Sequence, residues 1–95
     1  MDDGIFQWDD AKAIANVERN GVTFEAARAA FKDPFALEWL DESEDHGENR
    51  FALIGMAENR LLFVAYTMRG ESIRLISARL AERFERRRYH DEDGK

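Results

Sequence analysis

The chain has 95 residues, 44% of them hydrophobic and 12% aromatic, and this composition predicts one folded domain rather than a disordered or two-domain chain. Its 20 acidic and 14 basic side chains give a net charge of −6, which opposes salt-driven adhesion to nucleic acid, so any phosphate binding has to be local. The absence of cysteine excludes disulfides and thiolate metal ligands, and the absence of an apolar run of about 20 residues, together with an acidic start, predicts a cytoplasmic protein without a membrane span.

The first helix is predicted after an extended start at residues 5–8. Asp9 is suited to be its N-cap, and Gly21 its C′ residue. The apolar period predicts that its core-facing side chains are Ala13, Ile14 and Val17. A polar stripe recurs every four residues and is most simply a solvated face, made of Lys12, Asn16 and Asn20.

A second helix and three or four strands are predicted next. Thr23 can cap that helix, and Asp33 with Pro34 ends it. Apolar runs at residues 35–40, 51–57 and 61–67, and a run that starts at Ser72, predict strands whose short connections make the sheet antiparallel. Between the first two strands lies an acidic segment, residues 41–48, which contains His46 and should be an exposed loop.

Residues 69–89 hold seven of the 14 basic side chains against three glutamates, although the rest of the chain is acidic. Segregated charge of this kind usually marks a binding face. Alternation at residues 72–77 places Arg74 on a strand, and helical spacing at residues 78–89 places Arg79 on the helix that follows. On that helix Leu80 and Phe84 are expected to pack on the sheet, and residues 90–95 are expected to form a polar tail. The outward row of that helix would consist of Arg79, Arg83, Arg86 and Arg87.

Two interpretations of Arg74 stay open from the pattern alone. An arginine among apolar strand residues needs a partner, which could be the carboxylate of Glu82 or Glu85. In the other interpretation, Arg74 converges with Arg69 and Arg79 at one end of the sheet. Three guanidinium groups there could hold a phosphate and offset charge during phosphoryl transfer.

The other candidate residues also have a plain and a functional interpretation. The helix arginines Arg83, Arg86, Arg87 and Arg88 form either a solvated face or a contact with RNA or a partner chain. His46 is by default an exposed loop histidine, and it becomes a candidate acid or base if the loop folds over the arginines. Tyr89 could stack on a base or donate a hydrogen bond.

Residues 6–27 (FQWDDAKAIANVERNGVTFEAA) and residues 69–89 (RGESIRLISARLAERFERRRY) resemble the BrnT family of type II toxins. The resemblance runs from about Phe6 to Tyr89, and one position departs from it, because relatives usually carry a histidine where this chain has Asn20. Many spaced matches make the resemblance specific. They are Trp8, Asp9, Lys12, Asn16, Gly21, Val22, Phe24, Asp33, Glu48, Arg50, Gly55, Arg69, Arg74, Ile76, Ser77, Ala78, Arg79, Glu82 and Tyr89.

The resemblance implies a small α+β domain similar to RelE-type ribonucleases, with two N-terminal helices, an antiparallel sheet of three to four strands and a C-terminal helix, its core at about residues 5–89. It also implies an endoribonuclease that halts translation without a metal or other cofactor. A BrnA-like antitoxin with a ribbon-helix-helix region would neutralise the toxin, form a complex with it that could be a heterotetramer, and provide the only contact with promoter DNA.

The site residues that this resemblance implies fall into two groups. Arg74 and Arg79 would stabilise the phosphate and Arg69 would orient it, while His46 or Tyr89 would transfer protons or contact a base. Contacts with RNA or antitoxin would come from Lys12, Arg50, Arg83, Arg86 and Arg87. The alternative function is a non-catalytic module whose arginine face binds an acidic segment of a partner.

Overall fold

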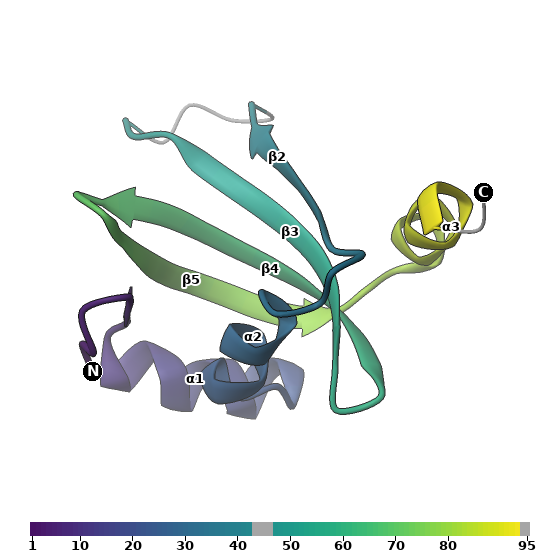
Figure 1. Ribbon diagram of the computed structural model, residues 1–95. Helices are drawn as coiled ribbons and strands as arrows, with labels where there is room; N and C mark the ends of the chain where they lie inside the picture. Colours follow the sequence, from purple (N-terminus) through teal and green to yellow (C-terminus); the bar gives the residue numbers. More distant parts are fainter. Residues whose placement is uncertain (43–46, 94–95) are drawn as a thin grey trace.

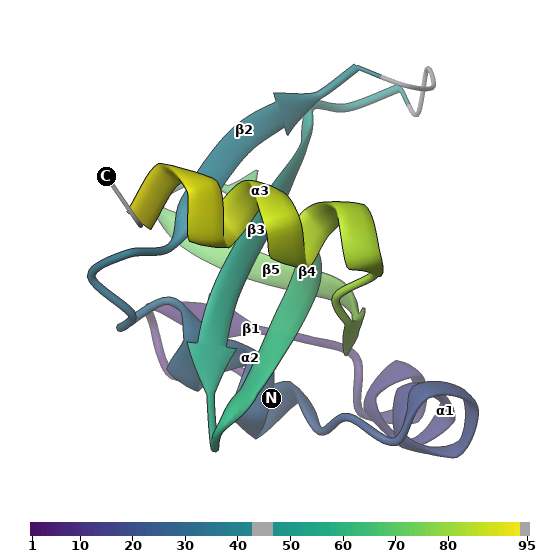
Figure 2. The same cartoon turned by 90° about the vertical axis from the view of Figure 1, so that its right-hand side faces the viewer.

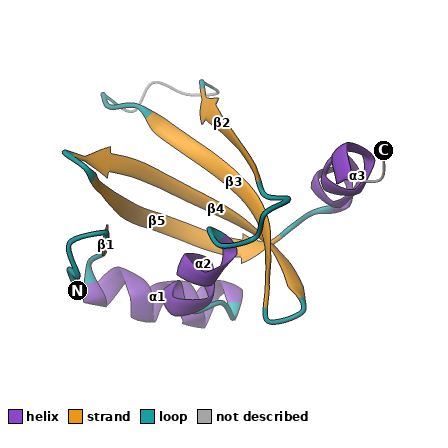
Figure 3. Cartoon of the chain, in the orientation of Figure 1, coloured by secondary structure: helices purple, strands orange, loops and turns teal. Residues whose placement is uncertain are grey.

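The computed structural model describes residues 1–42 and 47–93, which form a small α+β domain (Figures 1 and 3). The helices are α1 (Asp10–Asn20), α2 (Phe24–Ala30) and α3 (Arg83–Asp93). The strands are β1 (Phe6–Gln7), β2 (Leu37–Asp41), β3 (Arg50–Ala57), β4 (Arg60–Arg69) and β5 (Ser72–Leu80). None of these helices, within the described ranges, is long and apolar enough to cross a membrane.

The five strands form one mixed sheet in the order β1-β5-β4-β3-β2. Strands β2 to β5 pair antiparallel, which confirms the predicted sheet. The prediction of three to four strands missed β1, which lies parallel to β5 with Phe6 opposite Ile73. A strand of two residues has no alternation to detect, and its partner lies more than 60 residues away in the sequence. The sheet is therefore wider than predicted, and β1 covers only the first part of the β5 edge.

Both ends of α1 are as predicted, but its buried face is not. The carboxylate of Asp9 accepts hydrogen bonds from the first-turn backbone, and Gly21 ends the helix at φ 69°. However, Ile14 and Val17, which were predicted to face the core, are 64% and 43% exposed. The buried residue is Asn16, at 3% exposure. Helix α1 packs beside the β5 edge, where backbone groups need polar partners, and this explains why an amide faces inward.

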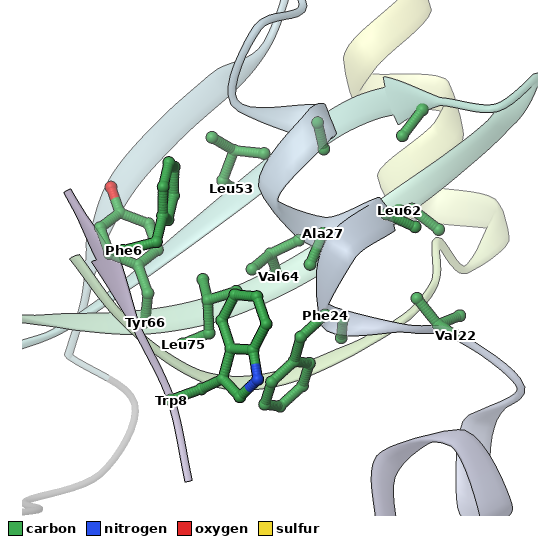
Figure 4. Close-up of a cluster of buried hydrophobic side chains, with 14 residues drawn as sticks. Phe6, Trp8, Val22, Phe24, Ala27, Leu53, Leu62, Val64, Tyr66 and Leu75 are labelled. Carbon is green, nitrogen blue, oxygen red and sulfur yellow. The ribbon is translucent and has the colours of Figure 1, made fainter. Parts of the chain in front are cut away.

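The main core lies between α2 and the sheet, as Figure 4 shows. Thr23 caps α2 as predicted, because its Oγ1 accepts from the N–H of Ala26 at 3.0 Å. The helix packs so closely on β3 that a Cβ atom added at Gly55 would lie 2.7 Å from the Ala30 carbonyl oxygen. The fully buried side chains of this core include Val22, Phe24, Leu62 and Val64.

A β-bulge interrupts the pairing of β5 with β4. Leu75 lies opposite Tyr66, but Ser77 lies opposite Ala65, so Ile76 is an extra residue on β5. Because side chains alternate between the two faces of a strand, one inserted residue reverses the alternation for everything after it. The residues of β5 after the bulge therefore lie on the face opposite to the one that uninterrupted alternation would give them.

The bulge decides which face the β5 arginines occupy. Arg74 lies opposite Thr67 and Arg79 opposite Phe63, and Thr67 and Phe63 are four positions apart on β4. The two arginines therefore share one face although they are five positions apart, which an uninterrupted strand does not allow. Ala78 is four positions after Arg74 and would share its face in an uninterrupted strand, but it points into the core on the opposite face, with 0% exposure.

The C-terminal helix begins later than predicted and turns a different side inward. Strand β5 continues to Leu80, so Arg79 lies on a strand and not in a helical row with the later arginines. Helix α3 crosses the sheet face opposite α1 and α2 (Figure 2), with Tyr89 and Glu85 buried. Leu80 and Phe84, expected to pack on the sheet, are 49% and 66% exposed. The helix also continues to Asp93 through the segment expected to be a polar tail.

The inward side of α3 is set by the first turn of the helix. Glu85 reaches back so that its Oε1 accepts the backbone N–H of Glu82 at 2.8 Å. The same carboxylate pairs with Arg79 on β5, and this requires Glu85 to face the sheet. Amphipathic spacing alone favours Phe84 as the residue that faces the sheet. The ion pair with Arg79 and the cap on the Glu82 N–H place Glu85 there instead.

Candidate functional site

The candidate site is the half of the sheet face that α3 leaves uncovered. Beneath α3 this face is apolar, with Ile54 and Leu61 buried against Tyr89. Away from α3 the cross-strand register brings polar side chains together, and none of the helices in the described residues covers them. We call this part the open face, and its polar residues are Gln7, Asp41, Arg50, Thr67, Arg69, Ser72, Arg74 and Ser77.

Two arginines bracket the centre of the open face. Arg50 on β3 and Arg74 on β5 both lie opposite Thr67 on β4. Adjacent strands are about 4.8 Å apart, so the two backbone positions are about 10 Å apart. Thr67 itself is 3% exposed and its Oγ1 donates to the Asn49 carbonyl at 2.6 Å, so a bound group would contact the long guanidinium side chains on either side and not the Thr67 hydroxyl. Arg69 lies two residues further along β4 on the same face.

Neither bracketing arginine is held in an ion pair by the described residues, although Asp41 on β2 lies opposite Arg50 on the same face. Arg74 donates from Nη1 to the Gln7 amide oxygen at 3.0 Å, and neither arginine forms an ion pair with any residue in 1–42 or 47–93. The Nε of Arg50 is buried and has no hydrogen-bond partner within those ranges. The interpretation that Arg74 pairs with Glu82 or Glu85 is therefore wrong. Buried donors are normally satisfied, so an unpartnered one is a place where an anion or water is expected.

Arg69 has a weaker electrostatic neighbour. Its Nη2 lies 3.6 Å from a carboxylate oxygen of Glu48, and the two side chains are 51% and 38% exposed. Exposed pairs at this distance contribute about 0–1 kcal/mol, so an incoming phosphate can compete with Glu48. Arg69 lies on the same face as Arg74 at this end of the sheet, and its role in orienting a phosphate stays a prediction.

Arg79 does not join the other arginines in one pocket, contrary to the predicted convergence. Arg79 lies opposite Phe63 and Arg74 opposite Thr67, and these two β4 residues are four positions apart, which corresponds to about 13 Å along the strand. Its guanidinium forms a two-pronged ion pair with Glu85 at 2.8 and 2.9 Å and lies 4.2 Å over the Phe63 ring. The hydrogen bond with Glu85 raises the pKa of Arg79, which opposes any loss of its charge. In this structure Arg79 anchors α3 to the sheet.

The two residues predicted for proton transfer have different positions. Tyr89 is buried at 4% exposure, and its hydroxyl donates to Asp33 Oδ2 at 2.7 Å. The backbone N–H of Met56 donates to the same oxygen, so Asp33 joins α3 to β3. This contact is structural, and the catalytic role of Tyr89 stays a prediction. His46 lies outside the described residues, and its role also stays a prediction.

The predicted contact residues on α3 and α1 are exposed. Arg83, Arg86 and Arg87 point away from the sheet, whereas the neighbouring Arg88 lies 4.5 Å over the Trp39 ring. Lys12 is exposed on α1, at the side of the helix that carries Asn16. These positions are accessible to RNA or to a partner, and the predicted contacts remain untested.

The sequence interpretation missed the role of the α1 polar stripe. Asn16 donates from Nδ2 to the carbonyls of Val22 and Ala78, both at 2.8 Å, and its Oδ1 accepts from the Ala78 N–H at 3.1 Å. Asn20 donates to the same Ala78 carbonyl at 3.0 Å. The four-residue polar repeat was the available signal, but it was assigned to solvent. The stripe instead holds β5 just after its bulge, between Arg74 and Arg79.

Comparison with protein families identifies a relationship. The family of the ribonuclease toxin BrnT of type II toxin–antitoxin systems matches residues 8–85, which include α1, the whole sheet after β1 and the start of α3. Comparison with curated proteins gives no match. A toxin of this type implies an antitoxin as its partner. The match covers most of the sequence, and the chain therefore belongs to the BrnT family of ribonuclease toxins.

Proposed function

We propose that this protein is a metal-independent endoribonuclease that inhibits translation and is neutralised by a BrnA-like antitoxin. The observation that carries the proposal is the pair Arg50 and Arg74, which bracket the open face and form no ion pair within residues 1–42 and 47–93, in a chain of net charge −6. Two cations that are free of ion pairs with the described residues, on a mostly acidic molecule, favour a local site for phosphate. A ribonuclease family supplies the chemical context for that site.

The proposed chemistry uses the RNA's own 2′-hydroxyl as nucleophile. Its oxygen attacks the adjacent phosphorus, the bond to the 5′ oxygen breaks, and the products are a 2′,3′-cyclic phosphate and a 5′-hydroxyl. One proton leaves the 2′-hydroxyl and one reaches the departing 5′ oxygen. Negative charge builds up on the phosphate oxygens in between, and guanidinium donors stabilise it.

The structure suggests how the residues divide this work. Arg74 is oriented through Gln7, and its other N–H groups remain available for a phosphate oxygen. Arg50 approaches from the other side of Thr67, and Arg69 extends the cationic surface. Arginine keeps its proton at neutral pH, so these residues bind and stabilise but do not transfer protons. His46 and Tyr89 remain predictions for that step.

The test is cleavage of single-stranded RNA by the purified protein in the presence of EDTA. Arg74→Ala and Arg50→Ala should each lower kcat/KM by about 10²–10³-fold, because each removes a donor that stabilises transition-state charge. The control is Lys32→Ala, which removes an exposed cation outside the open face and should leave cleavage unchanged. Wild-type activity in Arg74→Ala would refute the assignment.

The proposed cellular function is tested by expressing the chain alone in bacteria. Growth arrest with loss of RNA, relieved by Arg74→Ala or by a co-expressed ribbon-helix-helix antitoxin, is the expected result. The antitoxin alone is proposed to contact promoter DNA, so the isolated toxin should not bind that DNA. Copurification and the mass of the complex would test the proposed heterotetramer.

A second candidate function is favoured by the surface of α3. Arg83 and Arg87 are exposed beside Phe84, which is 66% exposed, and Arg86 is exposed further round the helix, so this helix offers an apolar side chain flanked by cations. Such a surface suits an acidic segment of a partner protein. A non-catalytic binding module predicts harmless expression of folded protein and no RNA cleavage, which separates it from the toxin.

A further inference from the structure

A second cationic site lies beside the open face, in a cleft between α1 and β5. The cleft has a volume of about 280 Å³. Helix α1 supplies one wall and the bulged part of β5 the other, at the stretch of the β5 edge that β1 does not cover. Its lining residues are Lys12, Ala15, Asn16, Arg19, Ile76 and Ser77.

The cleft is cationic, and its charges are not neutralised from within the described part of the chain. Lys12 and Arg19 are exposed, and neither forms an ion pair or a side-chain hydrogen bond within residues 1–42 and 47–93. They are seven residues apart on α1, which places them about 10 Å apart along the helix on either side of Asn16. No carboxylate lines the cleft. In a chain of net charge −6, such a site favours an anion.

Asn16 forms a fixed wall of this cleft and is not available to a ligand. Both N–H groups of its amide donate to backbone carbonyls, and its oxygen already accepts from the Ala78 N–H and from Asn20. The groups left for a ligand are the two cations and the hydroxyl of Ser77, which makes no hydrogen bond within residues 1–42 and 47–93. An ammonium, a guanidinium and a hydroxyl are all donors, and together they suit phosphate oxygens.

Ser77 connects the cleft to the open face. It lines the cleft, and it also shares the face of Arg74, because the bulge at Ile76 turns it to that side. An RNA strand that crosses the open face can therefore continue over the β5 edge and still contact hydrogen-bond donors. The volume lies near the lower end of small-ligand pockets, about 300 Å³, which suits one nucleotide unit better than a packed protein segment.

We propose that this cleft is a second subsite for the RNA backbone, where Lys12 and Arg19 bind a phosphate next to the scissile one and Ser77 donates to it. This inference rests on the proposed function, because it takes the RNA to cross the open face. The subsite positions the strand and takes no part in bond breaking. The affinity of this subsite does not depend on the base sequence of the RNA, because the subsite contacts only the phosphate backbone of the RNA.

The experiment measures binding of a short 2′-O-methyl oligoribonucleotide, which lacks the nucleophile, over a range of salt concentrations. The double variant Lys12→Ala/Arg19→Ala is compared with Arg28→Ala/Lys32→Ala, which removes the same charge near α2. Each lost phosphate contact on single-stranded nucleic acid lowers the slope of log K against log salt by about 0.7. We expect a fall of about 0.7 for the cleft variant, because its two cations bind one phosphate, and little change for the control. Equal slopes in the two variants would overturn the proposal.

Two further measurements separate the possible failures. If the cleft variant loses RNA affinity but wild-type protein never cleaves unmodified RNA, the endoribonuclease proposal fails and the subsite stands. If RNA is cleaved but both double variants bind it alike, the subsite fails alone. If a polyglutamate peptide, and not RNA, depends on Lys12 and Arg19, the cleft binds an acidic protein and the proposal is wrong. Melting curves should show that both double variants remain folded, because Lys12, Arg19 and Lys32 are exposed and the ion pair of Arg28 with Asp3 is partly exposed.

Discussion

Replacing Asn16 with alanine should destabilise the protein more than any surface change on α1. The Asn16 amide is the only described side chain that bonds both the N–H and the carbonyl of Ala78, and it also satisfies the carbonyl of Val22. All three residues are almost fully buried, at 3%, 0% and 0% exposure. Water therefore cannot easily replace the lost partner.

The magnitude follows from the groups that the change leaves unpaired. The Ala78 N–H and the Val22 carbonyl lose their partner, whereas the Ala78 carbonyl keeps the hydrogen bond from Asn20. A buried unsatisfied group costs about 1–3 kcal/mol, so Asn16→Ala should lower the free energy of unfolding by about 3 kcal/mol. In a domain of this size that corresponds to a Tm lower by about 10–20 °C.

Urea unfolding followed by circular dichroism measures the difference. Asn20→Ala is the matched control, because it removes a hydrogen bond to the same carbonyl but leaves no buried group without a partner. We expect it to cost about 1 kcal/mol or less. If Asn16→Ala and Asn20→Ala are equally stable, the amide does not hold β5 as we infer.

Three further changes test the packing of α2, the attachment of α3 and the acid limit of stability. Gly55→Ala should cost about 1–3 kcal/mol in urea unfolding, because the new methyl group would meet the Ala30 carbonyl at 2.7 Å, and a neutral result would contradict that close approach. Arg79→Met should cost about 2 kcal/mol in urea unfolding, less than for a fully buried pair because the Arg79 side chain is 36% exposed. Adding Glu85→Met should recover only part of this loss, because it removes the unpaired carboxylate but also the cap on the Glu82 N–H, and a double variant no more stable than Arg79→Met would contradict the unpaired carboxylate as the cause. Burial raises the pKa of Asp33, but hydrogen bonds from a tyrosine hydroxyl and two backbone N–H groups outweigh it and hold the pKa below 3.8. The stability that the Asp33 carboxylate contributes is thus present above pH 3.8 and is lost as the pH falls through the lowered pKa of Asp33 in the folded protein. In Asp33→Asn, the free energy of unfolding from urea titrations should therefore depend less on pH below 3.8 than in the wild type.

Local signals predicted the elements whose ends are fixed by single residues. The caps Asp9 and Thr23 mark the starts of α1 and α2 in the structure, and Gly21 ends α1 in the left-handed region at φ 69°. These signals work because an N-cap or C′ residue acts on backbone groups within its own turn of helix. Strands β3 and β4 were found for a similar reason, since a short connection forces neighbours to pair antiparallel.

Amphipathic patterns predicted the wrong buried faces for α1 and α3, because both helices meet polar groups of the sheet. Asn16 is buried and Ile14 is exposed, since α1 packs against the backbone edge of β5. On α3, Glu85 is buried and Phe84 is exposed, since Arg79 on β5 needs a carboxylate. A hydrophobic pattern records which side chains avoid water, but it contains no information about hydrogen bonds to residues far away in the sequence.

The sequence by itself determined the small α+β domain, most of its elements, the clustering of arginines near the C-terminus and the resemblance to a toxin family. Only the tertiary structure decided where the arginine side chains lie. The bulge at Ile76 turns Arg79 to the face of Arg74, and the ion pair with Glu85 then holds it under α3, while Arg50 comes in from a strand outside the arginine-rich segment. Register and bulges depend on pairing between distant strands, so the composition of the site follows from contacts that no local pattern records.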